Sequence, residues 1–286
     1  MVSLKDYENG ETAWCPGCGN FQILKAVKQA LVNLKLEPYQ VVFVSGIGQA
    51  GKLPHYLKCN LFNGLHGRSL PVATGIKIAN HELTVLAVGG DGDGYGEGGN
   101  HLIHAIRRNI NITYIVHNNQ IYGLTKGQAS PTSEMGLVTK TTPQGIVLKP
   151  FNPIAMAISL GATFVARGYS AKIPHLTGLI EAGINHKGFA LIDVLQPCVS
   201  FNRLNTYQWY NERVYDVKTD LEFNPENSSK AFDKSLEWGE RIPIGVIYRS
   251  KRKSYEQKLS ALKSGTLIRK KYSVEKVKKT VNEFLP

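Results

Sequence analysis

The sequence predicts an α/β fold, a doubly wound and mainly parallel sheet with an extension at its carboxyl-terminal end. Short apolar strands alternate with helical segments up to about residue 200, which is the pattern of βαβ units. Two of these strands, 83–88 and 112–116, each run into polar residues, and a single helix separates them. Further on, the alternation gives way to polar loops, an aromatic cluster at 207–210 and a charged tail. We therefore expect an α/β domain over 1–200 and an extension over 201–286 that contacts the core or a partner.

The elements of the first part follow from the spacing of apolar residues. We expect a helix over 21–34, where six apolar side chains recur at helical spacing. A short buried strand over 41–44 runs into the turn Ser45-Gly-Ile-Gly48, and a short helix over 53–57 follows. The next helix, 71–80, has proline in its first turn, where the backbone N–H has no helical partner in any case.

The second part of the core continues the same alternation. Residues 97–109 form the crossover helix between the two strands that end in polar residues. The remaining elements are a helix over 152–160, a strand over 163–166, a helix over 173–186 and a strand over 189–194 that leads to Gln196-Pro-Cys198. Strands joined by single helices run parallel, so their carboxyl ends meet at one edge of the sheet.

Length and composition restrict the class of protein. A chain of 286 residues with 42% apolar residues can bury a substantial core. No apolar run reaches the roughly 18 residues of a membrane span, and the first residues lack the apolar segment of a signal peptide. We therefore expect a cytoplasmic protein with no membrane partner. Its four cysteines then serve metal or cluster binding rather than disulfides.

Most of the net charge lies in the tail. Residues 241–286 hold 13 Lys or Arg against three Glu, which is +10 of the total +12. A basic tail on a nearly neutral body favours docking to an acidic partner, and the alternative is a solvated helix with lysines on its outer face. No zinc-finger spacing or RNP-like motif accompanies the tail, so we expect no nucleic-acid partner.

The stretch 89–125 is the most informative part of the chain. A strand enters a glycine-rich turn that carries Asp91 and Asp93, and Asn119 follows the next strand, 28 residues after Asp91. Glycines let the backbone approach an anionic ligand closely, and carboxylate and amide oxygens are ligands that Mg²⁺ prefers. The pattern predicts a diphosphate held through a magnesium ion. The alternative is a pair of turn-forming residues.

Gly-Asp-Gly followed 28 residues later by Asn-Asn resembles the fingerprint of thiamine diphosphate-dependent enzymes. With four further motifs it resembles the β subunit of the 2-oxoacid:ferredoxin oxidoreductases of the archaeal two-subunit type, from about residue 10 to about residue 215. Those motifs are Trp14-Cys-Pro-Gly-Cys-Gly-Asn20, His66-Gly-Arg68, Arg107-Arg108-Asn109 and Tyr122-Gly-Leu-Thr-Lys-Gly-Gln-Ala-Ser-Pro-Thr132. The fold that the resemblance implies is the pyrophosphate-domain type that binds thiamine diphosphate.

The resemblance implies coenzyme A-dependent oxidative decarboxylation of a 2-oxoacid to acyl-CoA and CO₂, with electrons passed through an iron–sulfur cluster to ferredoxin. The substrate is pyruvate, 2-oxoglutarate or a broad range of 2-oxoacids. In such families a larger α subunit, or a fused αγ subunit, supplies the carboxylate that activates the aminopyrimidine. This chain has no evident Glu for that role, so the resemblance implies that it is active only with its partner.

The resemblance also assigns the cofactor residues. Asp91, Asn119 and the Ile121 carbonyl would hold Mg²⁺, and the other contacts would come from Gly48, Gly90, Gly92, Asp93, Gly123, Leu124 and Thr125. Lys52 would pair with the substrate carboxylate or be an ordinary solvated lysine. His66 and Arg68 would line the site or form a structural salt bridge.

Cys15, Cys18 and Cys198 fall where the family places ligands of one [4Fe–4S] cluster, and a C-x-x-C pair for zinc or redox exchange is the alternative. Family members carry a fourth cysteine directly after Ser-Gly-Ile-Gly, where this chain has Gln49. Three outcomes stay open: Cys59 completes the cage, three cysteines hold the cluster, or no stable [4Fe–4S] forms. A glutamine amide is a poor ligand for such an iron.

Two other functions compete with this interpretation. A non-redox thiamine diphosphate-dependent decarboxylase or carboligase would keep Asp91 and Asn119 and use no cluster. A basic nucleic-acid-binding protein would act through 241–286 and would not respond to magnesium. The three cysteines argue against the first, and the Gly-Asp-Gly fingerprint argues against the second.

Overall fold

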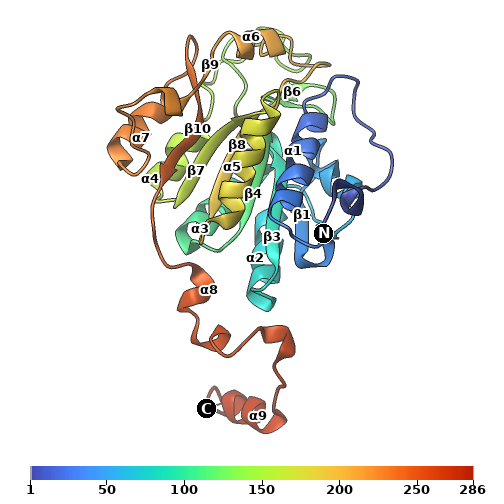
Figure 1. Ribbon diagram of the computed structural model, residues 1–286, viewed down its shortest axis with the longest axis vertical. Helices are drawn as coiled ribbons and strands as arrows, with labels where there is room; N and C mark the ends of the chain where they lie inside the picture. Colours follow the sequence, from blue (N-terminus) through green and yellow to red (C-terminus); the bar gives the residue numbers. More distant parts are fainter. Residues whose placement is uncertain (1, 286) are drawn as a thin grey trace.

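A computed structural model describes residues 2–285, in which one sheet lies between two layers of helices (Figure 1). Every neighbouring pair from β2 to β7 in this sheet is parallel. The predicted doubly wound, mainly parallel sheet is therefore confirmed. In spatial order the strands are β2 (Asn60–Asn63), β1 (Val41–Ser45), β3 (Thr84–Gly90), β4 (Thr113–Asn118), β8 (Ala190–Leu195), β7 (Phe164–Tyr169), β10 (Ile242–Arg249) and β9 (Val214–Asp216).

Two apolar cores form because side chains alternate between the faces of the central strands. Phe43 and Leu86 belong to the core on one face, and their neighbours Val44 and Ala87 belong to the core on the other. Helices cover both faces, so most side chains of the central strands are apolar, and the polar ones, among them His117, Arg167 and Asp193, are buried as well. The first core packs against α1 (Asn20–Asn33) and α5 (Ile173–Asn185), and the second against α2 (Ser69–Ala79), α3 (Gly99–Arg108), α4 (Pro153–Ser159) and α7 (Ser228–Ser235).

The helices and strands expected in the first 200 residues are present, with ends shifted by a few residues. The largest local difference lies after β3, where the glycine-rich turn forms a π-helical segment, Gly92–Glu97, before α3 begins. The short helix expected at 53–57 is the 3-10 helix Ala50–Tyr56. None of the helices described between residues 2 and 285 combines the length and the apolar character needed to cross a membrane.

The extension holds elements that the sequence analysis did not identify. The strand β10 runs antiparallel to β7 and joins the main sheet, and β9 pairs with it in parallel. Proline and glycine are depleted in strand interiors, and Pro243 and Gly245 lie within β10, which hides its apolar pattern. The predicted division of the chain at residue 200 stays a prediction. In the structure, β10 of the extension belongs to the same sheet as the core strands.

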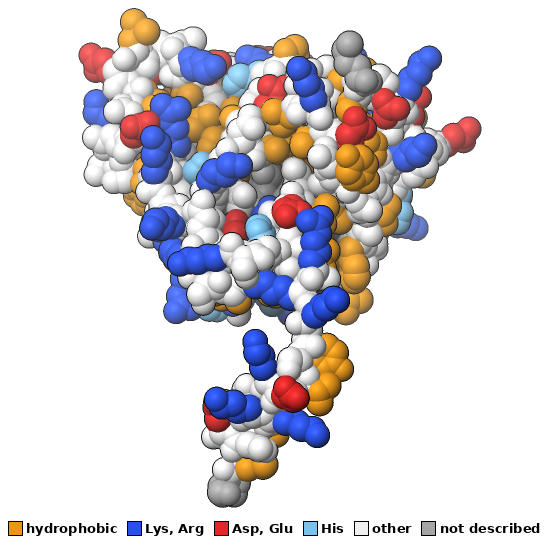
Figure 2. Space-filling model, turned by 60° about the horizontal axis from the view of Figure 1, so that its bottom comes forward, with side chains coloured by type: hydrophobic (Ala, Val, Ile, Leu, Met, Phe, Trp, Pro, Cys, Tyr) orange, Lys and Arg blue, Asp and Glu red, His pale blue; other side chains and the backbone are white. Residues whose placement is uncertain are grey.

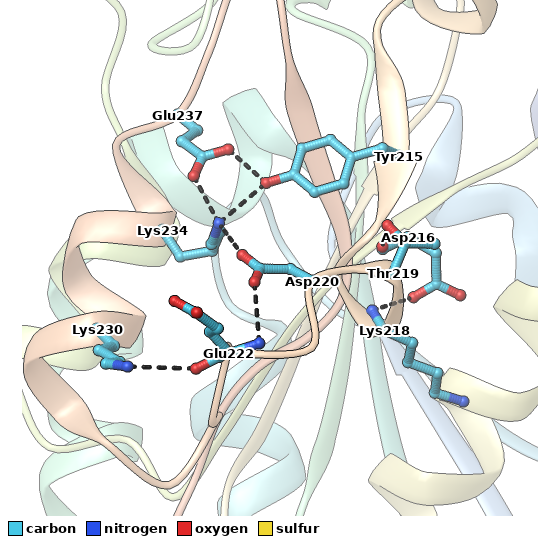
Figure 3. A network of polar contacts seen from close by, with 9 residues as sticks. All are labelled: Tyr215, Asp216, Lys218, Thr219, Asp220, Glu222, Lys230, Lys234 and Glu237. Carbon is cyan, nitrogen blue, oxygen red and sulfur yellow. Dashed lines mark hydrogen bonds and ion pairs between the residues drawn. The ribbon is translucent and has the colours of Figure 1, made fainter.

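A polar network holds the extension together (Figure 3). The ammonium group of Lys234, on α7, lies 2.9 Å from Asp220 and 2.7 Å from Glu237, and the Tyr215 hydroxyl donates to Glu237. Burial alone would lower the pKa of Lys234, but hydrogen bonds with these three side chains outweigh it and raise the pKa. The network ties α7 to the β9 segment. It also holds Glu237, the residue that precedes Trp238 in the chain.

The basic tail leaves the body at the edge where the parallel strands begin, because β10 runs antiparallel to them. Its first part is tied down there: the Tyr255 N–H, in α8 (Tyr255–Lys258), donates to the Asn109 carbonyl at 3.1 Å. Farther along, α9 (Val274–Asn282) has no buried residue and projects from the body. Figure 2 shows Lys and Arg side chains gathered on this end of the molecule and along the tail.

Candidate active site

The carboxyl ends of β1, β3, β4 and β8 lie side by side, and polar segments follow each of them at this edge of the sheet. All ten residues expected to contact the cofactor line a single cavity there, and His66 lines it with them. The ten are Gly48, Gly90, Asp91, Gly92, Asp93, Asn119, Ile121, Gly123, Leu124 and Thr125. Their roles toward a cofactor stay predictions, but the fold does bring them together.

Asp91 is the most buried carboxyl group of this cavity, at 1% exposure. Its Oδ2 accepts hydrogen bonds from the Ser130 hydroxyl at 2.5 Å and from the Thr132 hydroxyl at 2.6 Å. Burial nevertheless raises the pKa of Asp91 to about 6, although both hydroxyls favour the charged form. A bound cation would relieve this desolvation cost by replacing the proton, so the group fits a metal-binding role.

Ser130 and Thr132 were not assigned a role from the sequence. Both lie in the motif that ends at Thr132, but the spacing of that motif does not show which side chain turns back toward Asp91. The loop places the Thr132 hydroxyl between two residues, 2.6 Å from Asp91 and 2.8 Å from the side-chain oxygen of Asn118.

The other two expected magnesium ligands lie on the segment after β4. The Asn119 side-chain oxygen accepts from the Ile121 N–H at 3.0 Å, so the amide is already oriented by a turn. Within residues 2–285 no three His, Cys, Asp or Glu side chains form a ready metal-binding group. The expected magnesium set is of a different kind, with one carboxylate, one amide and one backbone carbonyl, which are the hard oxygen donors that Mg²⁺ takes.

Asp93 connects three segments around the cavity. Its Oδ1 accepts from the Ile47 N–H at 2.9 Å and from the Gly67 N–H at 2.8 Å. The turn after β1 and the turn before α2 are thereby tied to the glycine-rich segment. Burial raises the pKa of Asp93, and the two backbone donors partly offset the shift. His66 lies beside this group, with Nδ1 3.5 Å from Asp93 and 3.1 Å from Glu97.

Tyr122 packs against the glycine-rich segment. Its hydroxyl lies 3.4 Å from the Gly92 carbonyl and 3.2 Å from Glu97. A Cβ atom built on Gly92 would lie 2.3 Å from the Tyr122 ring, so no larger residue fits without displacing the ring. Glycine is required here for close approach rather than for an unusual backbone angle.

Two of the expected site residues do not line this cavity. Lys52 lies on the 3-10 helix after β1, and its ammonium group is 3.4 Å from the Ala13 carbonyl. Arg68 is exposed, and its guanidinium contacts the His101 ring at 2.5 Å. Their predicted contacts with substrate or cofactor stay predictions.

The three cysteines expected to bind a cluster line a second cavity, and Gln49 lines both this cavity and the first. Cys18 is buried, which raises the pKa of its thiol to about 11, and the nearby thiols of Cys198 and Cys15 add to the shift. Thiolates that share one cavity repel each other unless a metal supplies positive charge between them. The three thiols fit a thiolate-bound metal group in donor type, but within residues 2–285 they are not arranged as a ready metal-binding group.

The cysteine loop is fixed against the turn after β1. The Trp14 indole N–H donates to the Gln49 carbonyl at 2.9 Å, and the Trp14 ring packs edge-on against Phe21 and Tyr56. The side-chain oxygen of Gln49 is buried without a hydrogen-bond partner among the described residues. Gln49 therefore lies beside the cysteine cavity with its backbone carbonyl paired and its side-chain oxygen unpaired.

Cys59 is not brought together with the other three cysteines. It is half-buried against the first apolar core, and it does not line the cysteine cavity. Burial raises the pKa of its thiol to about 12, and a hydrogen bond from the Phe43 backbone offsets part of the shift. Of the three outcomes left open by the sequence, this placement argues against completion of the cage by Cys59. A cluster held by three cysteines and the absence of a stable cluster both stay open.

Family models match most of the chain. Residues 42–194 match the C-terminal, thiamine pyrophosphate-binding domain of the thiamine pyrophosphate enzymes. Residues 198–264 match the C-terminal part of the beta chain of pyruvate ferredoxin oxidoreductase. The first match covers the strands that frame the cofactor cavity. The second begins at Cys198 and covers the extension through β10.

Individual relatives agree with these matches. The chain is 49% identical over 259 residues to the 2-oxoacid:ferredoxin oxidoreductase subunit beta of Saccharolobus solfataricus, covering 86% of this chain and 85% of that one. It is 38% identical over 251 residues to the 2-oxoglutarate synthase subunit KorB of Methanocaldococcus jannaschii, covering 87% and 92%. A solved 2-oxoglutarate:ferredoxin oxidoreductase from Magnetococcus marinus, with 2-oxoglutarate, coenzyme A and succinyl-CoA bound, has a TM-score of 0.91 at 33% identity, covering 100% of this chain and 97% of that chain.

Proposed function

Because the chain belongs to the β subunits of the 2-oxoacid:ferredoxin oxidoreductases, which are thiamine diphosphate-dependent enzymes, we propose that it carries the cofactor half of a coenzyme A-dependent 2-oxoacid oxidation and passes electrons through an iron–sulfur cluster to ferredoxin. One observation supports this most directly. The ten expected cofactor residues line one cavity, the three cysteines line the next, and Gln49 borders both.

The chain's own residues bind and orient the cofactor. Asp91, Asn119 and the Ile121 carbonyl would hold Mg²⁺ and, through it, the diphosphate. Gly92 lets the backbone come close, and Tyr122 covers the glycine-rich segment and excludes water from it. When bound, thiamine diphosphate supplies the nucleophile and the electron sink that decarboxylation of a 2-oxoacid needs.

A cluster held by Cys15, Cys18 and Cys198 would lie directly beside the cofactor, since the two cavities share wall residues. Electrons released by oxidation would then cross only the shared wall. This adjacency favours the redox function over a non-redox decarboxylase, which has no use for three cysteines at that place.

The naming of the relatives as β subunits implies an α-subunit partner. We propose that this partner is a larger α subunit or a fused αγ subunit, and that it supplies the activating carboxylate and most coenzyme A contacts. The structure of the Magnetococcus marinus relative contains 2-oxoglutarate and coenzyme A, and we propose a 2-oxoacid and coenzyme A as substrates here. Location in the cytoplasm and the choice among pyruvate, 2-oxoglutarate and a broad range stay predictions.

The basic tail has two possible targets, an acidic ferredoxin and the partner subunit, and its position favours the second. The tail leaves at the amino-end edge of the sheet, whereas the cysteines lie at the carboxyl edge. Strands of six residues separate the two edges by about 20 Å. We therefore propose that the tail contacts the partner subunit rather than a ferredoxin that docks beside the cysteines.

The test is anaerobic iron and acid-labile sulfide analysis, with electron paramagnetic resonance, on the chain purified with its partner. We expect about three to four irons per chain, loss of most iron in Cys198→Ser, and no loss in the matched variant Cys59→Ser. Gln49→Cys should raise the iron content or the resistance of the cluster to oxygen. Bound thiamine diphosphate without iron would instead establish the non-redox enzyme, and loss of iron in Cys59→Ser would contradict the three-cysteine site.

A further inference from the structure

A third cavity, of about 250 Å³, lies at the same edge of the sheet on the side of β8 and β7. It is bordered by Arg167 and Asp193 on these strands, by the loop before α4 and by Trp238, which lies between α7 and β10. The residues that matter for its chemistry are Asn118, Thr132, Lys149, Phe151, Arg167 and Trp238. Nothing in the proposed reaction uses it.

The central feature of this cavity is a buried guanidinium group. Arg167, on β7, is 3% exposed and lines the cavity. Its Nε and Nη1 atoms have no hydrogen-bond partner among residues 2–285. Burial of guanidinium N–H groups without partners is destabilising, because they lose their hydration and no hydrogen bond replaces it. The arrangement indicates that an anion completes the site.

The nearest acid of the sheet does not fill this role. Asp193 is the register partner of Arg167 on β8 and lines the same cavity. One of its oxygens accepts from the Tyr95 hydroxyl at 2.7 Å, and the Asn118 amide lies 3.1 Å from that oxygen and 3.3 Å from the other. The opposite charges of Asp193 and Arg167 attract each other, but Asp193 accepts no hydrogen bond from Nε or Nη1 of the guanidinium group. The hydrogen bonds to the Asp193 carboxylate come from Tyr95 and Asn118 instead.

Aromatic packing fixes the guanidinium group without satisfying its N–H donors. The guanidinium carbon of Arg167 lies 5.4 Å from the centre of the Trp238 ring, and the Trp238 indole N–H donates to Glu134 at 2.5 Å. A π-face attracts the charge but accepts no pair of N–H groups in the plane of the guanidinium. The part of the guanidinium group that lines the cavity stays available to an anionic oxygen.

The other walls restrict the ligand further. Phe151, Trp238 and two prolines are apolar, Asn118, Gln120 and Thr132 are polar, and Lys149 adds an exposed second cation. The volume exceeds the share of a single water, about 30 Å³, several times over. A strongly hydrated inorganic anion would leave the apolar walls without contacts. A carboxylate with a short apolar body satisfies both kinds of wall.

We propose that this cavity binds a small aliphatic carboxylate, held by the guanidinium group of Arg167, at a site separate from the cofactor cavity. Thr132 lies between the two, since it lines this cavity and its hydroxyl is 2.6 Å from Asp91. An occupant therefore changes the hydrogen bonding of Asp91 and with it the affinity for magnesium. This coupling rests on the proposed function, whereas binding of the carboxylate does not.

The experiment measures thermal unfolding of the full chain without cofactor at constant ionic strength. The probes are butyrate, pyruvate and 2-oxoglutarate, with chloride and phosphate as comparison anions. We expect the unfolding temperature to rise with carboxylate concentration in the wild type, and the affinity to fall at least tenfold in Arg167→Met. The matched control is Arg213→Met, because Arg213 also stacks on a tryptophan, at 4.8 Å, but is paired with Glu212 at 3.0 Å. It should keep the full shift.

Three results would overturn the proposal: no carboxylate shift in the wild type, an equal shift with chloride or phosphate, or an unchanged shift in Arg167→Met. If Arg167→Met does not fold, Arg167→Lys serves instead, since lysine keeps the charge but cannot hold a carboxylate with two parallel hydrogen bonds. Asn119→Ala separates the two proposals, because it should abolish magnesium-dependent cofactor binding and leave the carboxylate shift intact.

Discussion

Asp91 lies at the end of β3 with 1% of its surface exposed, and two hydroxyl groups donate to it. These donors do not compensate for the loss of water, and the pKa of the carboxyl group stays raised, at about 6. The chain without metal therefore carries a buried carboxylate at neutral pH at a cost in stability. Such a group is suited to a cation, which stabilises the charged form that the fold alone disfavours.

The first prediction concerns this cost. The unfolded carboxyl group titrates near 3.8, so the folded chain binds the proton more tightly than the unfolded chain. The stabilisation from this group is complete below pH 3.8 and is lost as the pH rises through about 6. A pKa shift of two units corresponds to about 3 kcal/mol. In the variant part of this gain is lost, because the neutral amide accepts weaker hydrogen bonds from the two hydroxyl groups. Asp91→Asn should therefore raise the free energy of unfolding at pH 7.5 by about 2 kcal/mol.

The measurement is urea unfolding of the chain in EDTA at pH 4 and pH 7.5, with calorimetry of thiamine diphosphate and Mg²⁺ binding. The stability of the wild type should fall more steeply across this pH range than that of Asp91→Asn. The variant should bind no cofactor through magnesium. If Asp91→Asn were less stable than the wild type at pH 7.5, the charged Asp91 carboxylate would not destabilise the metal-free chain.

At the level of elements, the glycine-rich segment is held between neighbours that leave no room for side chains. The π-helical turn Gly92–Glu97 packs against Tyr122 on one side. On the other, the Tyr114 hydroxyl would lie 2.1 Å from a Cβ atom built on Gly94. Asp93 ties the same turn to the segments after β1 and before α2. The cavity wall is therefore formed by close packing rather than by a flexible loop.

The second prediction compares two glycines. Gly92→Ala should lower the free energy of unfolding by about 1–3 kcal/mol and weaken thiamine diphosphate binding, because the new methyl group must displace the Tyr122 ring. Gly75→Ala, in α2, meets nothing within 4 Å and should stabilise the chain by about 0.5–1 kcal/mol. Urea unfolding and cofactor calorimetry of both variants check this. Equal behaviour of the two would mean that the segment can relax around a side chain.

At the level of the whole molecule, the two edges of the sheet carry different features. The proposed cofactor cavity, the cysteine cavity and the Arg167 cavity all lie at the carboxyl edge. The tail is anchored at the amino edge and carries an exposed apolar stripe on α9, at Val274, Val277 and Val281. A helix that exposes apolar and basic side chains without covering any core is typical of a segment that packs against another chain.

The third prediction follows from this division. Residues 271–285 are almost entirely exposed, so removal of residues 271–286 should change the free energy of unfolding by less than about 0.5 kcal/mol. Association with the partner subunit should weaken about tenfold, or by about 1.4 kcal/mol. Ferredoxin reduction by the assembled enzyme should keep its dependence on ionic strength. Normal assembly with slower ferredoxin reduction would instead place ferredoxin on the tail.

Local patterns in the sequence predict the alternation of strands and helices and the sheet edge where ligands gather, because apolar periodicity decides which face of a strand or helix is buried. Asp91 and Asn119 follow neighbouring parallel strands, so both could be placed at this edge from the sequence. The ten residues of the cavity came as a set from the family resemblance of the motifs. The π-helical form of the glycine-rich turn was not predicted.

The contacts between distant side chains depend on the packed fold. It set Cys59 against the core rather than beside Cys15, and it turned Thr132 back onto Asp91. It also left Arg167 buried under Trp238, a residue of the extension. Such contacts join segments that no periodicity relates, and their energies depend on burial and on the hydrogen-bond partners available. These are properties of the packed molecule and not of the local sequence.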